Sequence, residues 1–210
     1  MVDFNFDKNF KSPVIGVDEV GRGSWAGPVF AVACTLNENK PLPQNLDDSK
    51  KLSSKKRYEI FENLKFVAQY GVGNSSNFEI DNFGIVKATF LSMERAINKL
   101  INKLSKINSF TLLIDGNVKP NFKEKYNAKI QQIIKGDAIS PSIAAASIIA
   151  KCKRDNFMRE IDRMAHGYGF SKNMGYGTEE HKTKLLLSGP TQFHRMSFSP
   201  MKKMKQNLKI

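Results

Sequence analysis

Acidic residues follow three of the short apolar runs in this sequence, each beside a glycine. Asp18 and Glu19 close the first run and precede a Gly-Arg-Gly triplet. Asp115 closes a later run, and Asp137 follows another within Lys-Gly-Asp. Ligands of α/β sheets commonly bind where loops leave the strand ends. We therefore expect Asp18, Glu19, Asp115 and Asp137 to form the catalytic, metal-binding part of one site.

Four carboxylates without a His or Cys ligand cluster form a hard oxygen site, which suits Mg²⁺ or Mn²⁺. Such a site needs metal, because closely packed anions otherwise raise one another's pKa and take up protons. Two divalent ions about 3.5–4 Å apart would activate water and stabilise the leaving oxygen of a phosphodiester. Any one of these acids alone would usually be a turn residue, so the hypothesis rests on their joint pattern.

Asp18 and Glu19 raise a geometric problem. Neighbouring side chains of a regular strand point to opposite faces of the sheet. Either the strand ends or bulges at this point, or Glu19 contributes through its backbone carbonyl. We favour the first alternative.

The elements that position these acids can be predicted from apolar patterns and helix caps. Short apolar runs indicate strands at 14–18, 29–36, 66–73, 110–115 and 128–134. Apolar residues spaced alternately by four and three predict a helix over 84–104. Further helices are expected over 54–67, from the Ser140-Pro141 cap to about 164, and from Thr178 to Gly189. The fold class is thus α/β, a mixed five-stranded sheet flanked by helices.

We interpret the chain as one catalytic domain, since it shows no repeat or long linker. Its core would span about 13–165, and a helical substrate-binding part would follow at about 166–200. The last ten residues carry four lysines and no acid, so we expect residues 201–210 to be a solvated basic tail.

The charge and the cysteines restrict the class of protein. Thirty-three Lys and Arg against twenty Asp and Glu give a net charge of +13, which favours a polyanionic partner. Only two cysteines and no signal-like or membrane-spanning run are present, so we expect a cytoplasmic protein without membrane contact. The three histidines share no metal spacing and are expected to be structural.

Several residues outside the acidic set are candidates for substrate contact. Lys50 and Lys51 begin a run of positive charge that could bind phosphates or simply be a solvated helix face. Gly21 and Gly23 permit close backbone approach on both sides of Arg22. Tyr176 lies between two glycines, where its ring could stack on a nucleotide or be an ordinary loop residue.

These motifs together resemble the ribonuclease HII family over about residues 13–200. The matching segments are GVDEVGRG at 16–23, AGPV at 26–29, DSKKLS at 48–53, DGN at 115–117, KGDA at 135–138, SIAAAS at 142–147, YGF at 168–170, GYGT at 175–178, His181 and GPT at 189–191. Two departures are Lys172-Asn173-Met174, which lacks one basic residue, and Ile139-Ser140-Pro141. Neither involves a predicted metal ligand, so they bear on substrate affinity.

The resemblance implies an RNase H-like fold and an endonuclease that cuts the RNA strand of RNA–DNA hybrids and ribonucleotides embedded in DNA. It places the family's metal-binding acids at Asp18, Glu19, Asp115 and Asp137. It assigns recognition of the ribose 2′-hydroxyl to Gly21, Arg22 and Gly23. Tyr176 would pack on the deoxyribose that follows the junction.

Two other functions stay open from the sequence. A ribonuclease HIII would carry an additional N-terminal domain, and only about a dozen residues precede the first strand here. A basic nucleic-acid-binding module would not need four clustered acids. The C-terminal segment 206–210 also faintly resembles a peptide that binds a bacterial sliding clamp, and we expect the chain to be monomeric.

Overall fold

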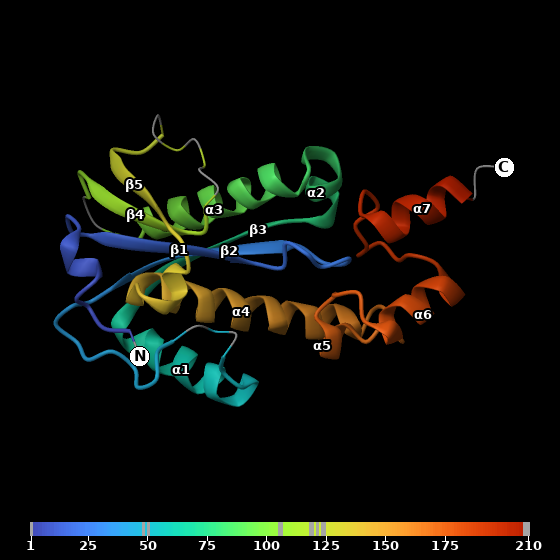
Figure 1. The fold of residues 1–210 in the computed structure, drawn as a ribbon, viewed down its shortest axis with the longest axis horizontal. Helices are drawn as coiled ribbons and strands as arrows, with labels where there is room; N and C mark the ends of the chain where they lie inside the picture. Colours follow the sequence, from blue (N-terminus) through green and yellow to red (C-terminus); the bar gives the residue numbers. More distant parts are fainter. Residues whose placement is uncertain are drawn as a thin grey trace.

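Five strands form one mixed sheet in the order β3-β2-β1-β4-β5 (Figure 1). The computed structural model describes residues 2–47, 49, 51–104, 107–117, 120, 122 and 125–207, except the side chains of Lys205 and Asn207. Neighbours β1, β2 and β3 pair antiparallel, whereas β1, β4 and β5 pair parallel. The strands are β1 Val14–Val20, β2 Val29–Leu36, β3 Ala68–Ser75, β4 Phe110–Asp115 and β5 Ala128–Ile133. The predicted mixed five-stranded sheet is therefore confirmed.

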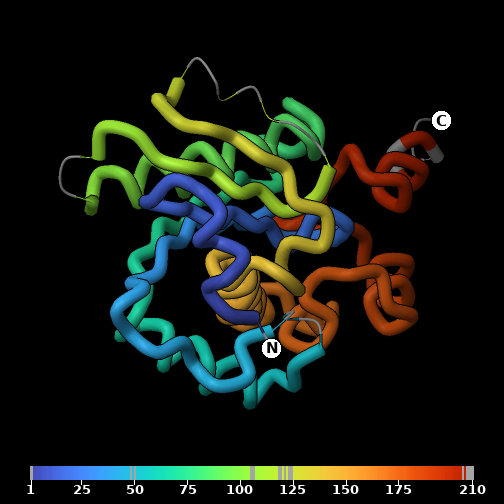
Figure 2. The backbone as a smooth tube through the Cα atoms, turned by 60° about the vertical axis from the view of Figure 1, so that its left-hand side comes forward, coloured from blue at the N-terminus to red at the C-terminus, as the bar shows by residue number. Residues whose placement is uncertain are grey.

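Helices cover both faces of the sheet. Helix α3 lies on one face, and α4 lies on the other with α1 outside it, an arrangement that the turned view also shows (Figure 2). Helices α5, α6 and α7 gather beyond one end of the sheet. The helices are α1 Ser54–Val67, α2 Asn77–Phe83, α3 Ile85–Ile101, α4 Pro141–Asp162, α5 Phe170–Asn173, α6 Glu179–Ser188 and α7 Ser199–Asn207, with 3-10 turns η1 Asp7–Asn9 and η2 Gly136–Ala138. None of the helices described is long and apolar enough to cross a membrane.

Two core layers result from the alternation of side chains along the strands. Ala31 and Ala33 of β2 pack with Ile15 and Val17 of β1 on the α3 side. The intervening residue Val32 packs on the opposite side, against α1 and α4. Both faces of the central strands are thus buried, which explains why these strands are continuous apolar runs.

The sequence misplaces some elements. The strand expected from residue 66 begins at Ala68, because α1 continues through Val67 and Ala68 is its C-cap. The helix expected over 84–104 ends at Ile101. Helix α2, which was not predicted, begins with a capping box in which Ser76 and Glu79 satisfy each other's backbone N–H.

The prediction of a solvated tail over 201–210 is wrong at Met201, whereas Lys202, Lys203 and Gln206 are exposed. These residues belong to α7, and Met201 is fully buried in a cluster with Met158, Ile161 and Leu185. Burial of this methionine against α4 and α6 provides the free energy that its lysine-rich neighbours could not.

Helix α4 packs against β1 so closely that no side chain fits between their backbones at Gly16. A Cβ atom added to Gly16 would overlap backbone atoms of Ser142 and Ile143. The N-terminus of α4 is held there by the predicted Ser140 cap and by Asp7, whose carboxylate accepts bonds from the Ser140 hydroxyl at 2.6 Å and the Ser142 N–H at 3.1 Å. The absence of a side chain at position 16 therefore sets the position of α4 relative to the end of β1.

Gly16→Ala should lower the free energy of unfolding by about 2–3 kcal/mol, because neither backbone can move aside without repacking the helix. Urea denaturation of both proteins measures the difference. Gly23→Ala is the matched control, since its added Cβ would lie 3.8 Å from the nearest atom and should cost less than about 1 kcal/mol. Equal losses for the two variants would contradict this account of the α4–β1 contact.

Candidate active site

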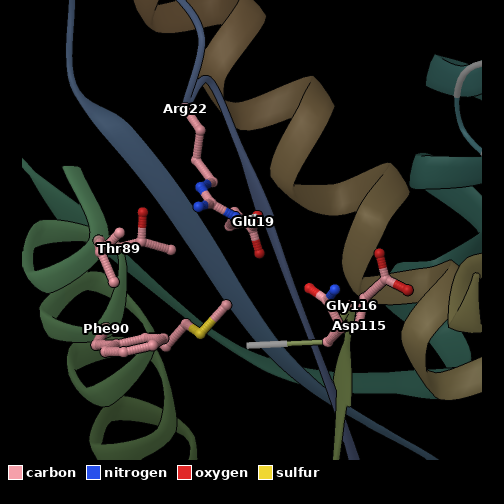
Figure 3. A pocket seen from close by; sticks show the side chains of 9 residues that line it. Glu19, Arg22, Thr89, Phe90, Asp115 and Gly116 are labelled. Carbon is pink, nitrogen blue, oxygen red and sulfur yellow. Dashed lines mark hydrogen bonds and ion pairs between the residues drawn. The ribbon is translucent and has the colours of Figure 1, made fainter. Parts of the chain in front are cut away.

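The parallel strands β1 and β4 separate at the end that holds the predicted acids. Their pairing stops at Val17 and Ile114, whereas β1 stays paired with β2 to its last residue. The residues that follow, Asp18 and Glu19 on β1 and Asp115 on β4, therefore border a common opening. Figure 3 shows Glu19 and Asp115 on the two sides of this opening.

Asp18 is buried on the α4 face of the sheet, with 6% of its surface exposed. Its carboxylate accepts a hydrogen bond from the Glu19 N–H at 2.7 Å and another from the Ser147 hydroxyl of α4. Burial, followed by the negative charges of Glu19 and Asp115, raises the pKa of Asp18 well above its usual value. Glu19 and Asp115 thus lie close enough to Asp18 to act on it electrostatically, as the sequence predicts.

Gly136, the residue before Asp137, is brought against Asp115 by a tight turn. Asp115 Oδ1 accepts a bond from the Gly136 N–H at 2.7 Å, and Asp137 follows in η2, where it is buried. Lys135 adopts a left-handed conformation with φ 55°, which allows the chain to turn back toward β4. Gly136 is needed here, since its Cβ would lie 2.5 Å from Ile143 Cδ1 and 3.3 Å from Asp115 Oδ1.

These acids do not surround one point with their side chains. Across the described part of the chain, no group of three or more His, Cys, Asp or Glu residues is placed so that it could hold a metal ion. One reason is that the Glu19 side chain points to the face of the sheet opposite to Asp18.

The preferred expectation that β1 ends or bulges at Glu19 is wrong. Strand β1 pairs with β2 in regular register from Gly16 to Val20, so Asp18 and Glu19 point to opposite faces.

The backbone carbonyl of Glu19 does not point in the direction of its side chain. Pro13 accepts a bond from the N–H of Thr111 on β4, and alternate residues of a strand direct their carbonyls to the same edge. The Glu19 carbonyl is therefore directed toward the β4 side, which leaves the backbone alternative in agreement with the fold.

The Glu19 side chain lies in a pocket between β1 and α3. Its Oε1 is 3.3 Å from Nη1 of Arg22, and Figure 3 shows the two side chains pointing toward one another. Thr89 and Phe90 of α3 line the same pocket, together with Asp115. Arg22 is 41% exposed, so its guanidinium neutralises part of the acidic edge while it remains accessible to an anion.

The two predicted sugar-reading elements lie next to each other, although more than 150 residues separate them in the chain. A Cβ on Gly23 would be 3.8 Å from Cε1 of Tyr176. The Tyr176 side chain is 40% exposed, and the Arg154 guanidinium lies 5.9 Å from the ring centroid. This arrangement offers a glycine-rich backbone and an aromatic surface to one ligand.

The basic loop before α1, which includes Ser49 and Lys51, reaches the site through buried polar contacts. Ser49 Oγ lies 2.9 Å from Ser147 Oγ, and Ser147 also contacts Asp18. Arg57, which is itself paired with a buried acid of α4, donates to the Ser49 carbonyl at 3.0 Å. Lys51 extends from this loop with 60% of its side chain exposed, and Lys50 lies outside the described residues.

The burial of Arg57, Arg154 and Arg195, which are bonded to loops around the site, was not predicted. Arginine in a charged sequence is usually exposed, so their burial could not be recognised from residue type. Ser147 was visible only as part of a longer matching segment.

Comparison with known proteins identifies the family. The Ribonuclease HII family model matches residues 15–201. A ribonuclease HII from Wolbachia of Brugia malayi is 40% identical over 199 residues, covering 95% of this chain and 94% of its own length. One from Jannaschia is 44% identical over 201 residues and covers 96% of both chains. The chain belongs to the ribonuclease HII family.

Solved structures agree with the ribonuclease H-like fold. Ribonuclease H2 from Pyrococcus horikoshii superposes with TM-score 0.71 at 23% identity, covering 93% of this chain and 98% of its own. Ribonuclease HII from Archaeoglobus fulgidus, solved in a complex with PCNA, gives 0.72 at 23% identity over 89% and 95%. A Bst-RNase HIII in complex with Mn²⁺ gives 0.72 at 21% identity, but this chain covers only 70% of it.

Membership of the ribonuclease HII family makes this protein a nuclease of the ribonuclease H type, and hence a hydrolase. The non-catalytic binding module that the charge alone allowed is set aside. The family model also decides between ribonuclease HII and ribonuclease HIII in favour of the former.

The raised pKa of Asp18 predicts how the stability of the folded chain depends on pH. The unfolded chain loses this proton near pH 4, whereas the folded chain retains it to higher pH, so stability falls as pH rises between the two pKa values. Asp18→Asn removes this penalty, and without divalent metal at pH 7.5 it should raise the free energy of unfolding by about 0.5–2 kcal/mol.

Urea denaturation in EDTA at pH 7.5 and at pH 4 measures this effect. The difference between the two proteins should shrink at pH 4, where about half of the unfolded chains keep the proton as well. An Asp18→Asn variant less stable than the wild type at both pH values would show that Asp18 is a net stabilising group.

Proposed function

We propose that this ribonuclease HII hydrolyses the RNA strand of RNA–DNA hybrids and cuts on the 5′ side of ribonucleotides embedded in duplex DNA. The supporting observation is the meeting of Asp18, Glu19 and Asp115 at the separation of β1 and β4. The Gly21–Gly23 loop and Tyr176 lie next to each other beside it. Products with a 5′-phosphate and a 3′-hydroxyl, as the family resemblance implies, would serve removal of ribonucleotides and RNA primers from DNA.

The donor set fits divalent cations. Carboxylates of Asp18, Asp115 and Asp137 and the backbone carbonyl of Glu19 are hard oxygen ligands, which suit two Mg²⁺ or Mn²⁺ ions. A raised pKa is expected for an acid whose negative charge is stabilised only when a cation binds, and Asp18 has this property. When bound, such ions supply an activated water and stabilise the leaving oxygen. The Mn²⁺ complex of Bst-RNase HIII is consistent with this choice.

The protein's own groups would bind and orient the substrate strand. Arg22 and the basic loop with Lys50 and Lys51 would contact phosphates, in keeping with the net charge of +13. Backbone groups of the Gly21–Gly23 loop would contact the 2′-hydroxyl, the group that distinguishes RNA from DNA. The exposed Tyr176 ring would pack on the following sugar, which lacks that hydroxyl.

Further parts of the proposal concern organisation and partners. Residues 166–200, which include Tyr176, would be the substrate-binding part of a single catalytic domain. The enzyme would act as a monomer in the cytoplasm. A sliding clamp is a candidate partner of the C-terminal segment, given the PCNA complex of the Archaeoglobus fulgidus relative. Residues 208–210 of that segment lie outside the described residues.

Asp18→Asn and Asp115→Asn should each reduce cleavage of a duplex with one ribonucleotide by more than about a thousandfold, because each removes a charged ligand. Binding to a non-cleavable duplex should persist or strengthen, since less negative charge faces the phosphates. Gel cleavage assays in Mg²⁺ and fluorescence anisotropy measure the two quantities. Asp3→Asn, in the exposed N-terminal segment, is the control. Near-normal turnover by either site variant would refute the assignment.

Tyr176→Ala should slow cleavage at a single embedded ribonucleotide about tenfold more than cleavage within a continuous RNA strand. Loss of one stacking surface usually costs about 1–3 kcal/mol, and only the junction places a deoxyribose at this ring. Both substrates are cut by both proteins in parallel and compared by kcat/KM. Equal losses on the two substrates would make Tyr176 structural.

A further inference from the structure

One short segment is linked by hydrogen bonds to both elements that the proposed function assigns to the junction, directly to the glycine-rich loop and through His181 to Tyr176. Residues 191–195 lie between α6 and α7 and form an isolated β-bridge in which His194 pairs with Ala26. His194 and Arg195 are neighbours in the chain and are both buried, with 1% and 0% of their surfaces exposed. Their side chains bind different partners.

Arg195 holds the glycine-rich loop by its backbone. Its guanidinium donates to the carbonyls of Gly21 at 2.7 Å, Arg22 at 2.8 Å and Gly27 at 2.9 Å. The backbone N–H of Arg195 donates to the carbonyl of Trp25 at 2.8 Å. The loop between β1 and β2 is thus attached at four carbonyls, and the planar guanidinium fixes three of them in a set geometry.

His194 reaches the Tyr176 backbone through a second histidine. Nδ1 of His194 accepts from the Thr191 N–H at 2.9 Å, so in the neutral ring Nε2 carries the proton. This Nε2 lies 3.0 Å from Nε2 of His181, which must accept. His181 Nδ1 therefore carries a proton and donates to the Tyr176 carbonyl at 2.9 Å. Each donor in the chain has one acceptor, which fixes both rings.

Burying the polar side chains of His194 and Arg195 costs free energy, which argues that their contacts do more than fill the core. Burial and the charge of His181 lower the pKa of His194 to about 4, so the ring is neutral at pH 7. Burial and the charge of Arg154 lower the pKa of Arg195 to about 9, as expected for a guanidinium taken out of water beside another positive charge. Apolar residues would stabilise a core more simply, whereas a satisfied polar network specifies a single geometry.

We propose that residues 191–195 are a positioning element that fixes the Gly21–Gly23 loop and Tyr176 relative to each other, and thereby sets the preference for RNA–DNA junctions. This inference rests on the proposed function. Arg195 and His194 do not touch the substrate in this scheme. They act through the loop and the tyrosine, whose separation must match one ribose followed by one deoxyribose.

The test uses the ratio of kcat/KM at a single embedded ribonucleotide to kcat/KM on a continuous RNA–DNA hybrid. Arg195→Lys keeps the charge but loses the planar fork, and His194→Leu removes the donor to His181. Each should lower the ratio about fivefold to tenfold. His194→Gln retains an amide donor near the position of Nε2 and should restore the ratio to within about twofold of the wild type.

Two features separate positioning from general stability. In a Tyr176→Ala background, Arg195→Lys and His194→Leu should change the ratio less than about twofold further, because without the ring there is nothing left to position. The matched controls are Arg95→Lys, which weakens the remote ion pair with Glu79, and His166→Leu at an exposed site. Both controls should leave the ratio unchanged, and thermal melting records the stability of every variant.

The outcomes are distinct. A wild-type enzyme that does not cut at the embedded ribonucleotide would refute the proposed function and this inference with it. A wild type that does, with ratios unchanged in Arg195→Lys and His194→Leu, would refute the inference alone. Ratios that fall equally with and without Tyr176 would also refute it. Should His194→Leu fail to fold, Arg195→Lys with its double variant decides the question.

Discussion

The contact between α4 and the backbone of β1 is the constraint on which the active site depends. It exists because position 16 is glycine, and it places one helix directly beneath the end of β1. From that helix Ser147 reaches Asp18 and Ser49, while Arg154 donates to carbonyls and hydroxyls of the loops on both sides of the substrate surface. A side chain at Gly16 would therefore displace several parts of the site together.

The site concentrates negative charge in a chain whose net charge is +13. Asp18 is buried beside Glu19 and Asp115, and its raised pKa shows that the fold holds this carboxyl at a cost. Basic side chains such as Arg22 and Lys51 are at least 40% exposed around it. This distribution suits a polyanionic substrate that binds the outer basic residues, while cations neutralise the inner acids. In the proposed function, the carboxyl group that lowers stability would be one that binds the cations.

In the proposed function, selection of a junction would depend on distance as well as on residue type. The glycine-rich loop follows β1, whereas Tyr176 belongs to the C-terminal part, and they lie next to each other only in the folded chain. Buried arginine and histidine side chains connect them by hydrogen bonds whose geometry is more restrictive than apolar packing. Under the proposed function, such an arrangement would let the enzyme read two adjacent sugars as a unit.

The sequence alone determined what depends on neighbouring residues and on motif. Strands at 29–36 and 110–115, helix α1 and the Ser140 cap were predicted at their observed positions, and the spaced acids and glycines identified the family. The tertiary structure alone decided the face of Glu19, the burial of α7 through Met201, and the internal positions of Arg195 and His194. Periodicity and capping act over a few residues and leave a local signal. The pairing of Glu19 with Ala31, the burial of Met201 among residues of α4 and α6, and the bonds of Arg195 to the β1–β2 loop depend on contacts between separate elements, which no local pattern encodes.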